Sequence, residues 1–390
     1  MTLGVPGPPG PFTWRPRLGD AAAIVALFAL TRALLIGAGV LAWSYPEGYY
    51  PWRGKDRSGV RYALAPGQPL VDMWARWDSW EYEEIARQGY WYDFRHQPRP
   101  YGTVACFPFY PLVVRAVGLV LGGRYVVGGL VVSNLAALGG FFLLFQWAAW
   151  WGDRRAAWVT VASAITFPPG LFWSALYPQS LFFCLTIAAF LLVLRGRVAW
   201  ASLVGVAVTA TRLEGVAILP ALLAIHVQRS GRIDRKALWL AVAPIGLLAY
   251  MGYLYARWGD PLLFLRVHAL FGRRSTNPLR TLVEPWTRPG GLGDFRVLLT
   301  YATGLMLFLG HRARLGWLIL LYGWLMFLIP LGTGVYESIY RIHLVNFPIY
   351  LALGLGLPGR WRILAWCVVV AFGTLQAAMM FGWVAGYRYP

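Results

Sequence analysis

Acidic side chains are concentrated in one stretch of the sequence, residues 71–111. The chain has only 16 acidic residues. The members of this group, interleaved with tryptophans and tyrosines, are Asp72, Asp78, Glu81, Glu83, Glu84 and Asp93. A carboxylate near a reacting hydroxyl accepts its proton as a general base, and its charge stabilises positive charge that develops in a transition state. The stretch therefore predicts acid–base chemistry.

The same stretch predicts the element that must position these groups. Residues 73–88 contain no Gly or Pro, and Trp74, Trp77 and Trp80 recur at every third position, which places them on one broad face of a helix. Asp78 follows Trp77 by about 100° around the helix axis, at the border of that face. Amphipathic aromatic helices lie in the membrane interface, so we expect Asp78 to meet lipid head groups and a lipid-linked substrate.

The composition indicates a polytopic membrane protein. Of the 390 residues, 58% are hydrophobic and 13% are charged, against roughly 25% charged in soluble domains. The net charge of +19 does not indicate nucleic-acid binding, because the arginines lie at the ends of apolar runs and form no single basic domain. The sequence has no CxxC and no His/Cys cluster, so neither a disulfide framework nor a metal site is expected.

Apolar runs divide the chain into a short N-terminal arm, residues 1–20, and a single transmembrane domain, residues 21–390. Eleven runs are candidate spans: 21–44, 125–150, 157–176, 180–194, 198–212, 214–228, 237–255, 295–310, 316–331, 343–358 and 363–384. A further run, 107–123, contains prolines and Arg115, and we interpret it as an interfacial helix. The expected fold is all-α, with about 11 transmembrane helices and interfacial helices in the first long loop.

The basic residues orient the predicted spans. With the N-terminus in the cytoplasm, every short basic loop falls on the cytoplasmic side, as the positive-inside rule requires. The two long loops, 45–124 and 256–294, then lie on the extracytoplasmic face, and the acidic stretch lies with them. No Walker A, GxGxxG or DxD motif occurs, so a cytosolic nucleotide sugar is not the expected donor.

Three patches of the sequence resemble the PIG-V family of mannosyltransferases. The most specific patch follows the family pattern RWD, IA, GY and AFFP-x-[FY]P at Arg76–Asp78, Ile85–Ala86, Gly89–Tyr90 and Ala105–Pro111. The other two patches are 174–180 and 211–215. They carry Gln179 where the family has an acidic residue and Glu214 where it has Asn.

This resemblance implies a GT-C fold, in which a multi-span enzyme uses a polyprenyl-phosphate sugar and carries an essential acid in the first extracytoplasmic loop. It implies that Asp78 is the general base and that mannose passes from polyprenyl-phosphate-mannose to a hydroxyl of a membrane-linked glycan or glycolipid, with inversion. No cofactor is expected, because the lipid-linked donor is a substrate. The active site would face the outside of a bacterial plasma membrane, or the ER lumen in a eukaryote.

Other residues are candidates for binding the donor phosphate or the substrate. The planar guanidinium of arginine matches phosphate oxygens. Charged side chains near the middle of the bilayer are costly to insert and are usually functional. These candidates come from the loops, the motif patches and the ends of spans: Arg76, Glu81, Tyr177, Gln179, Arg212, Glu214, Arg266, His268, Arg273, Arg274 and Arg341.

The sequence leaves alternatives open for these groups. Asp78 alternatively pairs with Arg76 or lies exposed at the interface, and Arg212 alternatively pairs with Glu214. Glu81, about one turn after Asp78, is expected to raise the pKa of Asp78 by like-charge repulsion. The basic second loop alternatively lies on anionic head groups. Rival functions are a transporter or flippase for an anionic lipid and a GT-C enzyme that uses another polyprenyl-linked sugar.

The predicted topology is testable by labelling. A cysteine introduced at Ser58 or Thr276 is expected to react with a membrane-impermeant maleimide added outside intact cells, because both long loops lie on that face. A cysteine at Gly231 is expected to stay unlabelled until the membrane is opened. Labelling at Gly231 with the other two positions silent would invert the topology.

Overall fold

The computed structural model describes residues 17–44, 64–65, 67–93, 95, 101–270, 272–273, 275–313, 315–357 and 359–385. Most of this part of the chain is helical. The helices of the bundle are α1 (Leu18–Trp43), α5 (Tyr125–Trp151), α6 (Arg154–Thr166), α7 (Gln179–Leu194), α8 (Val198–Thr211), α9 (Ile218–Ser230), α10 (Ile245–Trp258), α13 (Phe295–Arg312), α14 (Trp317–Leu331), α16 (Pro348–Gly356) and α17 (Arg362–Ala385).

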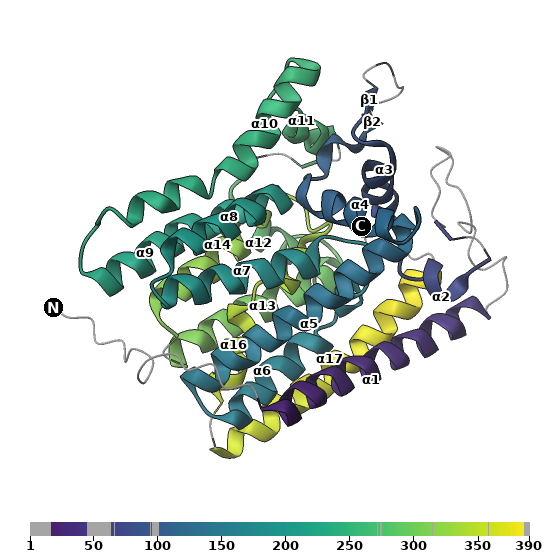
Figure 1. Ribbon diagram of the computed structural model, residues 1–390. Coiled ribbons are helices and arrows are strands. Elements are labelled where there is room, and N and C mark those ends of the chain that lie inside the picture. The colour runs from purple at the N-terminus through teal and green to yellow at the C-terminus, as the bar shows by residue number, and fades with distance from the viewer. Residues whose placement is uncertain are drawn as a thin grey trace.

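Shorter elements connect the bundle helices. They are α2 (Pro69–Asp72), α3 (Ser79–Gln88), α4 (Phe109–Val120), α11 (Leu263–Leu270), α12 (Pro278–Val283), α15 (Ile339–Leu344) and an antiparallel hairpin of β1 (Tyr92–Asp93) and β2 (Tyr101–Gly102). Figure 1 shows α2, α3 and α4 near the end of the bundle where α17 finishes. α2, α3, α4 and the hairpin belong to the first long loop, residues 45–124.

The bundle has the character of a polytopic membrane protein. Four helical stretches are long and apolar enough to cross a membrane: Leu18–Trp43, Tyr125–Trp151, Ala237–Trp258 and Gly359–Ala385. α1 and α17 pack against each other along one edge of the bundle (Figure 1). They expose large apolar side chains such as Leu34 and Val370. An exposed apolar surface of this kind is suited to contact with lipid and unfavourable in water.

Each of the eleven predicted runs overlaps one bundle helix. In the run 237–255, a 3-10 helix (Ala237–Val242) precedes α10, and two other predicted spans are interrupted. The run 157–176 was expected to be one helix, whereas α6 ends at Thr166 before Pro168 and Pro169. The run 343–358 is divided between α15 and α16, and α16 begins at Pro348. Proline lacks the backbone N–H that continues a helix and disfavours helical geometry in the residue before it, which accounts for both breaks.

The expected continuous helix over residues 73–88 is wrong. α2 ends at Asp72, residues 73–78 form turns, and α3 begins at Ser79. The carbonyls in this segment accept hydrogen bonds from distant parts of the chain. Met73 O accepts from Trp383 Nε1 at 2.8 Å, Trp74 O from Leu176 N at 3.0 Å and Arg76 O from Tyr177 Oη at 3.1 Å. Tertiary partners have replaced the bonds that a helix would make, so the three tryptophans do not share one helical face.

The apolar run 107–123 contains the short helix α4, which packs against α3 and α5. Its 12 residues span about 18 Å at 1.5 Å per residue, less than the roughly 30 Å hydrocarbon core of a bilayer. Bundle helices such as α6 and α16 are about as short, so the interfacial interpretation of residues 107–123 stays a prediction. Tyr82 of α3 lies edge-on to Tyr110 of α4, with ring centroids 5.4 Å apart.

Close packing of α8 and α10 generates a stability prediction. A Cβ added to Gly246 would lie 2.0 Å from Val206 O and 2.8 Å from Ala210 N, both backbone atoms of α8. Gly246→Ala is expected to destabilise the folded protein by about 1–3 kcal/mol, the usual cost of overpacking. Gly252→Ala on the same helix is the matched control, because nothing lies within 4 Å of a Cβ there. Thermal unfolding in detergent checks the pair, and equal melting temperatures would contradict this packing.

Candidate active site

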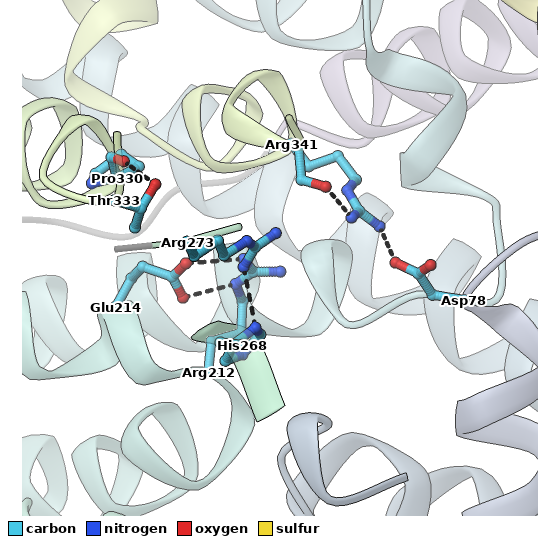
Figure 2. Close-up of polar contacts among 9 residues, drawn as sticks. Asp78, Arg212, Glu214, His268, Arg273, Pro330, Thr333 and Arg341 are labelled. Atoms are coloured by element: carbon cyan, nitrogen blue, oxygen red, sulfur yellow. Dashed lines mark hydrogen bonds and ion pairs between the residues drawn. The ribbon is translucent and has the colours of Figure 1, made fainter. Parts of the chain in front are cut away.

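An ion pair joins the acidic stretch to the C-terminal third of the chain. Asp78, immediately before α3, accepts a hydrogen bond from Arg341 of α15, with Oδ2 and Nη1 2.7 Å apart. The Asp78 side chain is 47% exposed and that of Arg341 is 14% exposed, so a buried cation is held against an accessible carboxylate (Figure 2). The alternative pairing with Arg76 is not observed: Arg76 pairs with Asp72 and donates to Val384 O.

Strained backbone lies on both sides of this ion pair. Among the described residues, the non-glycine positions with positive φ are Trp77, at 56°, and Ser338, at 65°. Trp77 directly precedes Asp78, and the Ser338 hydroxyl accepts a hydrogen bond from the Arg341 guanidinium. Such conformations cost on the order of 1–3 kcal/mol each and are concentrated at functional sites. The strain therefore marks the Asp78–Arg341 pair as a candidate catalytic centre.

Aromatic rings fix the position of Arg341. Its guanidinium lies over the rings of Tyr177 and Phe172, 5.2 Å and 5.7 Å from their centroids, an arrangement that attracts a cation to the ring face. Tyr177 also donates to Arg76 O at 3.1 Å. One tyrosine thus supports both the cation and the turn that carries Asp78.

A second group of charged residues lies beside this pair. Arg212 makes two hydrogen bonds to the Glu214 carboxylate, at 3.2 Å and 3.1 Å, which is the alternative that the sequence left open for these two residues. Arg273 lies next to them in Figure 2 and interacts electrostatically with Arg341, Glu214, Asp78 and Arg212. Within the described part of the chain, no carboxylate lies within salt-bridge distance of Arg273.

His268 supports Arg273 as a neutral side chain. Burial, with repulsion from Arg273 as a further cause, lowers the pKa of His268 to about 4. Arg273 Nη1 lies 3.2 Å from His268 Nδ1. A guanidinium only donates hydrogen bonds, so Nδ1 is the acceptor and the imidazole proton lies on Nε2. His268 thus orients Arg273 without adding a positive charge.

Glu81, the next carboxylate toward the C-terminus, is held in a different state. Burial and repulsion by Asp78 raise the pKa of Glu81 to about 8, so this carboxyl is mostly protonated at neutral pH. Its Oε2 lies 2.8 Å from Cys106 Sγ, and burial raises the pKa of the Cys106 thiol as well. Environment therefore separates two neighbouring acids into an accessible ionised carboxylate and a neutral carboxylic acid.

Several sequence candidates lie apart from this cluster. Arg76 is buried by its contacts with Asp72, Val384 and Trp43. Arg266 pairs with Asp260 while its side chain stays 76% exposed. Gln179, the first residue of α7, is fully buried, and Arg274 lies outside the described residues.

The structure also brings in residues that sequence reasoning missed. Cys106 had a signal, because it stands in the motif patch 105–111, but its contact with Glu81 crosses 25 residues of chain. No sequence pattern indicated Ser338, since serine gives no indication that its backbone adopts a left-handed φ.

The cluster has a surplus of positive charge. Asp78 and Glu214 carry two negative charges, whereas Arg212, Arg273 and Arg341 carry three positive charges and His268 is neutral. The surplus suits an anion, and phosphate oxygens match guanidinium groups. An anion site beside an accessible carboxylate can favour departure of a phosphate while the carboxylate takes a proton.

Solved structures of ArnT from Cupriavidus metallidurans have a similar arrangement of helices. The apo structure aligns with a TM-score of 0.51 over 94% of this chain and 77% of that chain, at 16% identity. The structure bound to undecaprenyl phosphate aligns with a TM-score of 0.49 over 91% and 76%, at 15% identity. No family model and no curated protein matches the sequence. The likeness to the apo structure shows the fold: an all-α polytopic membrane protein with the GT-C fold.

The protonation of Glu81 can be measured directly. Infrared spectra are expected to contain a carboxylic-acid C=O band at pH 7 that disappears on titration through about pH 8 and is missing in Glu81→Gln. Asp78→Asn is expected to move this titration to lower pH, because it removes a negative charge that favours the protonated acid. A Glu81 carboxyl that is already ionised at pH 6 would contradict this description of the site.

Proposed function

We propose that the chain is a membrane glycosyltransferase that transfers mannose from polyprenyl-phosphate-mannose to a hydroxyl of a membrane-linked glycan or glycolipid. The GT-C fold is the framework for this proposal, and the charges around Asp78 carry it. An accessible carboxylate, a strained turn and three guanidiniums lie together at one end of the bundle. The proposed active site opens to the extracytoplasmic face.

Arg273 is the observation that points to a phosphate-linked donor. Its guanidinium is partly buried and, within the described residues, has no carboxylate partner. A largely buried cation without a carboxylate at ion-pair distance is costly, and a bound phosphate would supply a direct counter-ion. Arg273 and Arg341 are therefore the proposed ligands of the donor phosphate, with His268 holding Arg273 in place.

The Asp78–Arg341 ion pair sets the order of events. While Arg341 holds it, the Asp78 carboxylate is a weakened base. When the donor phosphate takes over Arg341, the carboxylate is released to accept a proton. The acceptor oxygen then attacks the anomeric carbon, the bond from that carbon to the phosphate oxygen breaks, and the acceptor proton passes to Asp78. Lipid phosphate leaves beside the guanidiniums, and a β-linked donor gives an α-mannoside.

The identity of the sugar rests on the resemblance of residues 76–90 and 105–111 to the PIG-V pattern. The charges of the site suit any polyprenyl-phosphate sugar, so they do not select mannose over other sugars. The lipid-linked donor is itself a substrate, and the proposed reaction uses no resident cofactor.

Two substitutions separate the proposed base from the proposed phosphate ligand. Asp78→Asn keeps the shape and removes the base, so kcat is expected to fall by roughly 10²–10⁴-fold with little change in KM for the donor. Arg273→Gln is expected to raise KM for the donor by roughly 10–100-fold, the usual value of a hydrogen bond to a charged group. Transfer from radiolabelled polyprenyl-phosphate-mannose by the purified protein measures both effects.

The matched control is Glu84→Gln, which removes a carboxylate of α3 that pairs with Arg87 on the helix surface. Its kinetics are expected to equal those of the unsubstituted protein. Near-normal turnover by Asp78→Asn would overturn the mechanism. Transfer from polyprenyl-phosphate-glucose but not from the mannose donor would change the sugar and leave the reaction class intact.

A further inference from the structure

A cavity with both charged and apolar lining residues lies between the second long loop and the segment that leads into α15. It has a volume of about 350 Å³, within the range of about 300–1,000 Å³ typical of small-molecule sites. Its charged lining residues are Glu284, Arg288, Asp294, Arg296 and Glu337. None of these residues belongs to the cluster around Asp78 and Arg273, and the size suits a small ligand.

The charges of this cavity disfavour an anionic ligand. Both guanidiniums are neutralised within the loop: Arg288 pairs with Glu284, and Arg296 pairs with Asp294 at 2.7 Å. Glu337 is exposed and has no ion pair within the described residues, so the lining has three carboxylates and two guanidiniums. The donor phosphate therefore belongs to the Arg273–Arg341 region and not here.

The same groups match a polyhydroxylated neutral ligand. Carboxylates accept hydrogen bonds from hydroxyl groups, and the remaining guanidinium N–H groups donate to hydroxyl oxygens. Hydrogen bonds to charged groups are the stronger ones, so a saccharide would gain orientation as well as affinity. A lipid chain would remove the Glu337 carboxylate from water without supplying a hydrogen-bond donor, which is costly.

One short segment connects the cavity to the catalytic centre. Gly334, Val335, Tyr336 and Glu337 line the cavity, and the chain passes directly into Ser338, with its positive φ, and on to Arg341. Tyr336 anchors the segment by donating to Thr281 O at 2.9 Å. Only three residues, 338–340, lie between Glu337 in the cavity wall and Arg341, the partner of Asp78, so a ligand here would lie near the proposed reaction centre.

We propose that this cavity is the acceptor site and binds the neutral saccharide portion of the acceptor, with Glu337 and Asp294 as its hydroxyl ligands. The assignment to the acceptor rests on the proposed transferase function, whereas saccharide binding itself does not. Occupation of the cavity fixes the 334–337 segment and so helps to position Arg341 for the donor phosphate.

Saccharide binding can be tested without any donor. Saturation-transfer difference NMR on the purified protein is expected to show binding of mannobiose or cellobiose. Glu337→Gln and Asp294→Asn are expected to weaken this binding by about tenfold or more, through loss of charged acceptors. Asparagine keeps the N-cap that Asp294 provides to α13, so this variant should fold, and Glu84→Gln is the control with unchanged binding.

A transfer assay then separates this proposal from the proposed function. Glu337→Gln is expected to raise KM for the glycan acceptor by about tenfold while KM for the donor and hydrolysis of the donor by water stay unchanged. Saccharide binding without any transfer would overturn the proposed function and leave the cavity as a saccharide site. No saccharide signal, binding of calcium ions or inorganic phosphate in its place, or equal binding by all variants would overturn the cavity proposal.

Discussion

The ion pair between Asp78 and Arg341 is the constraint on which the candidate site depends. Its two members are 263 residues apart in sequence, so the pair exists only when the first long loop and the segment after α14 fold against each other. A largely buried guanidinium needs a partner, and Asp78 supplies it. Breaking the pair would remove a contact and also leave Arg341 as an uncompensated charge beside Tyr177 and Phe172.

The strained turn before α3 follows from the same constraint. A continuous helix through residues 73–88 would satisfy its own carbonyls but could not bind α17 and the 174–177 segment. Trp383 and Tyr177 instead donate side-chain hydrogen bonds to carbonyls of the turn. These tertiary bonds hold Trp77 in a conformation that a tryptophan rarely adopts. The strain thus aims Asp78 at α15, and the surrounding bundle stabilises it.

Most charged groups in this region are neutralised locally, and only a few remain available to a ligand. Arg212 and Glu214 compensate each other, His268 is neutral, and Glu81 keeps its proton beside Cys106. Arg273 and Arg341 remain as the cations available to an anion, beside an ionised carboxylate. The cavity near Glu337 carries the opposite charge balance. These charge balances favour a phosphate beside Arg273 and Arg341 and a neutral polyol in the cavity near Glu337.

The sequence by itself determined the membrane class, the positions of the bundle helices and the stretch that holds Asp78. The hydrophobic runs and the arginines at their ends are features of local composition, and local composition decides which segments enter the bilayer and how they are oriented. The tertiary structure alone decided that residues 73–78 are not helical, that Arg76 joins Asp72 and α17, and that Arg341 is the partner of Asp78. It also decided the protonation of Glu81 and His268. Long-range hydrogen bonds, burial and neighbouring charges set these outcomes, and none of them is encoded in the spacing of nearby residues.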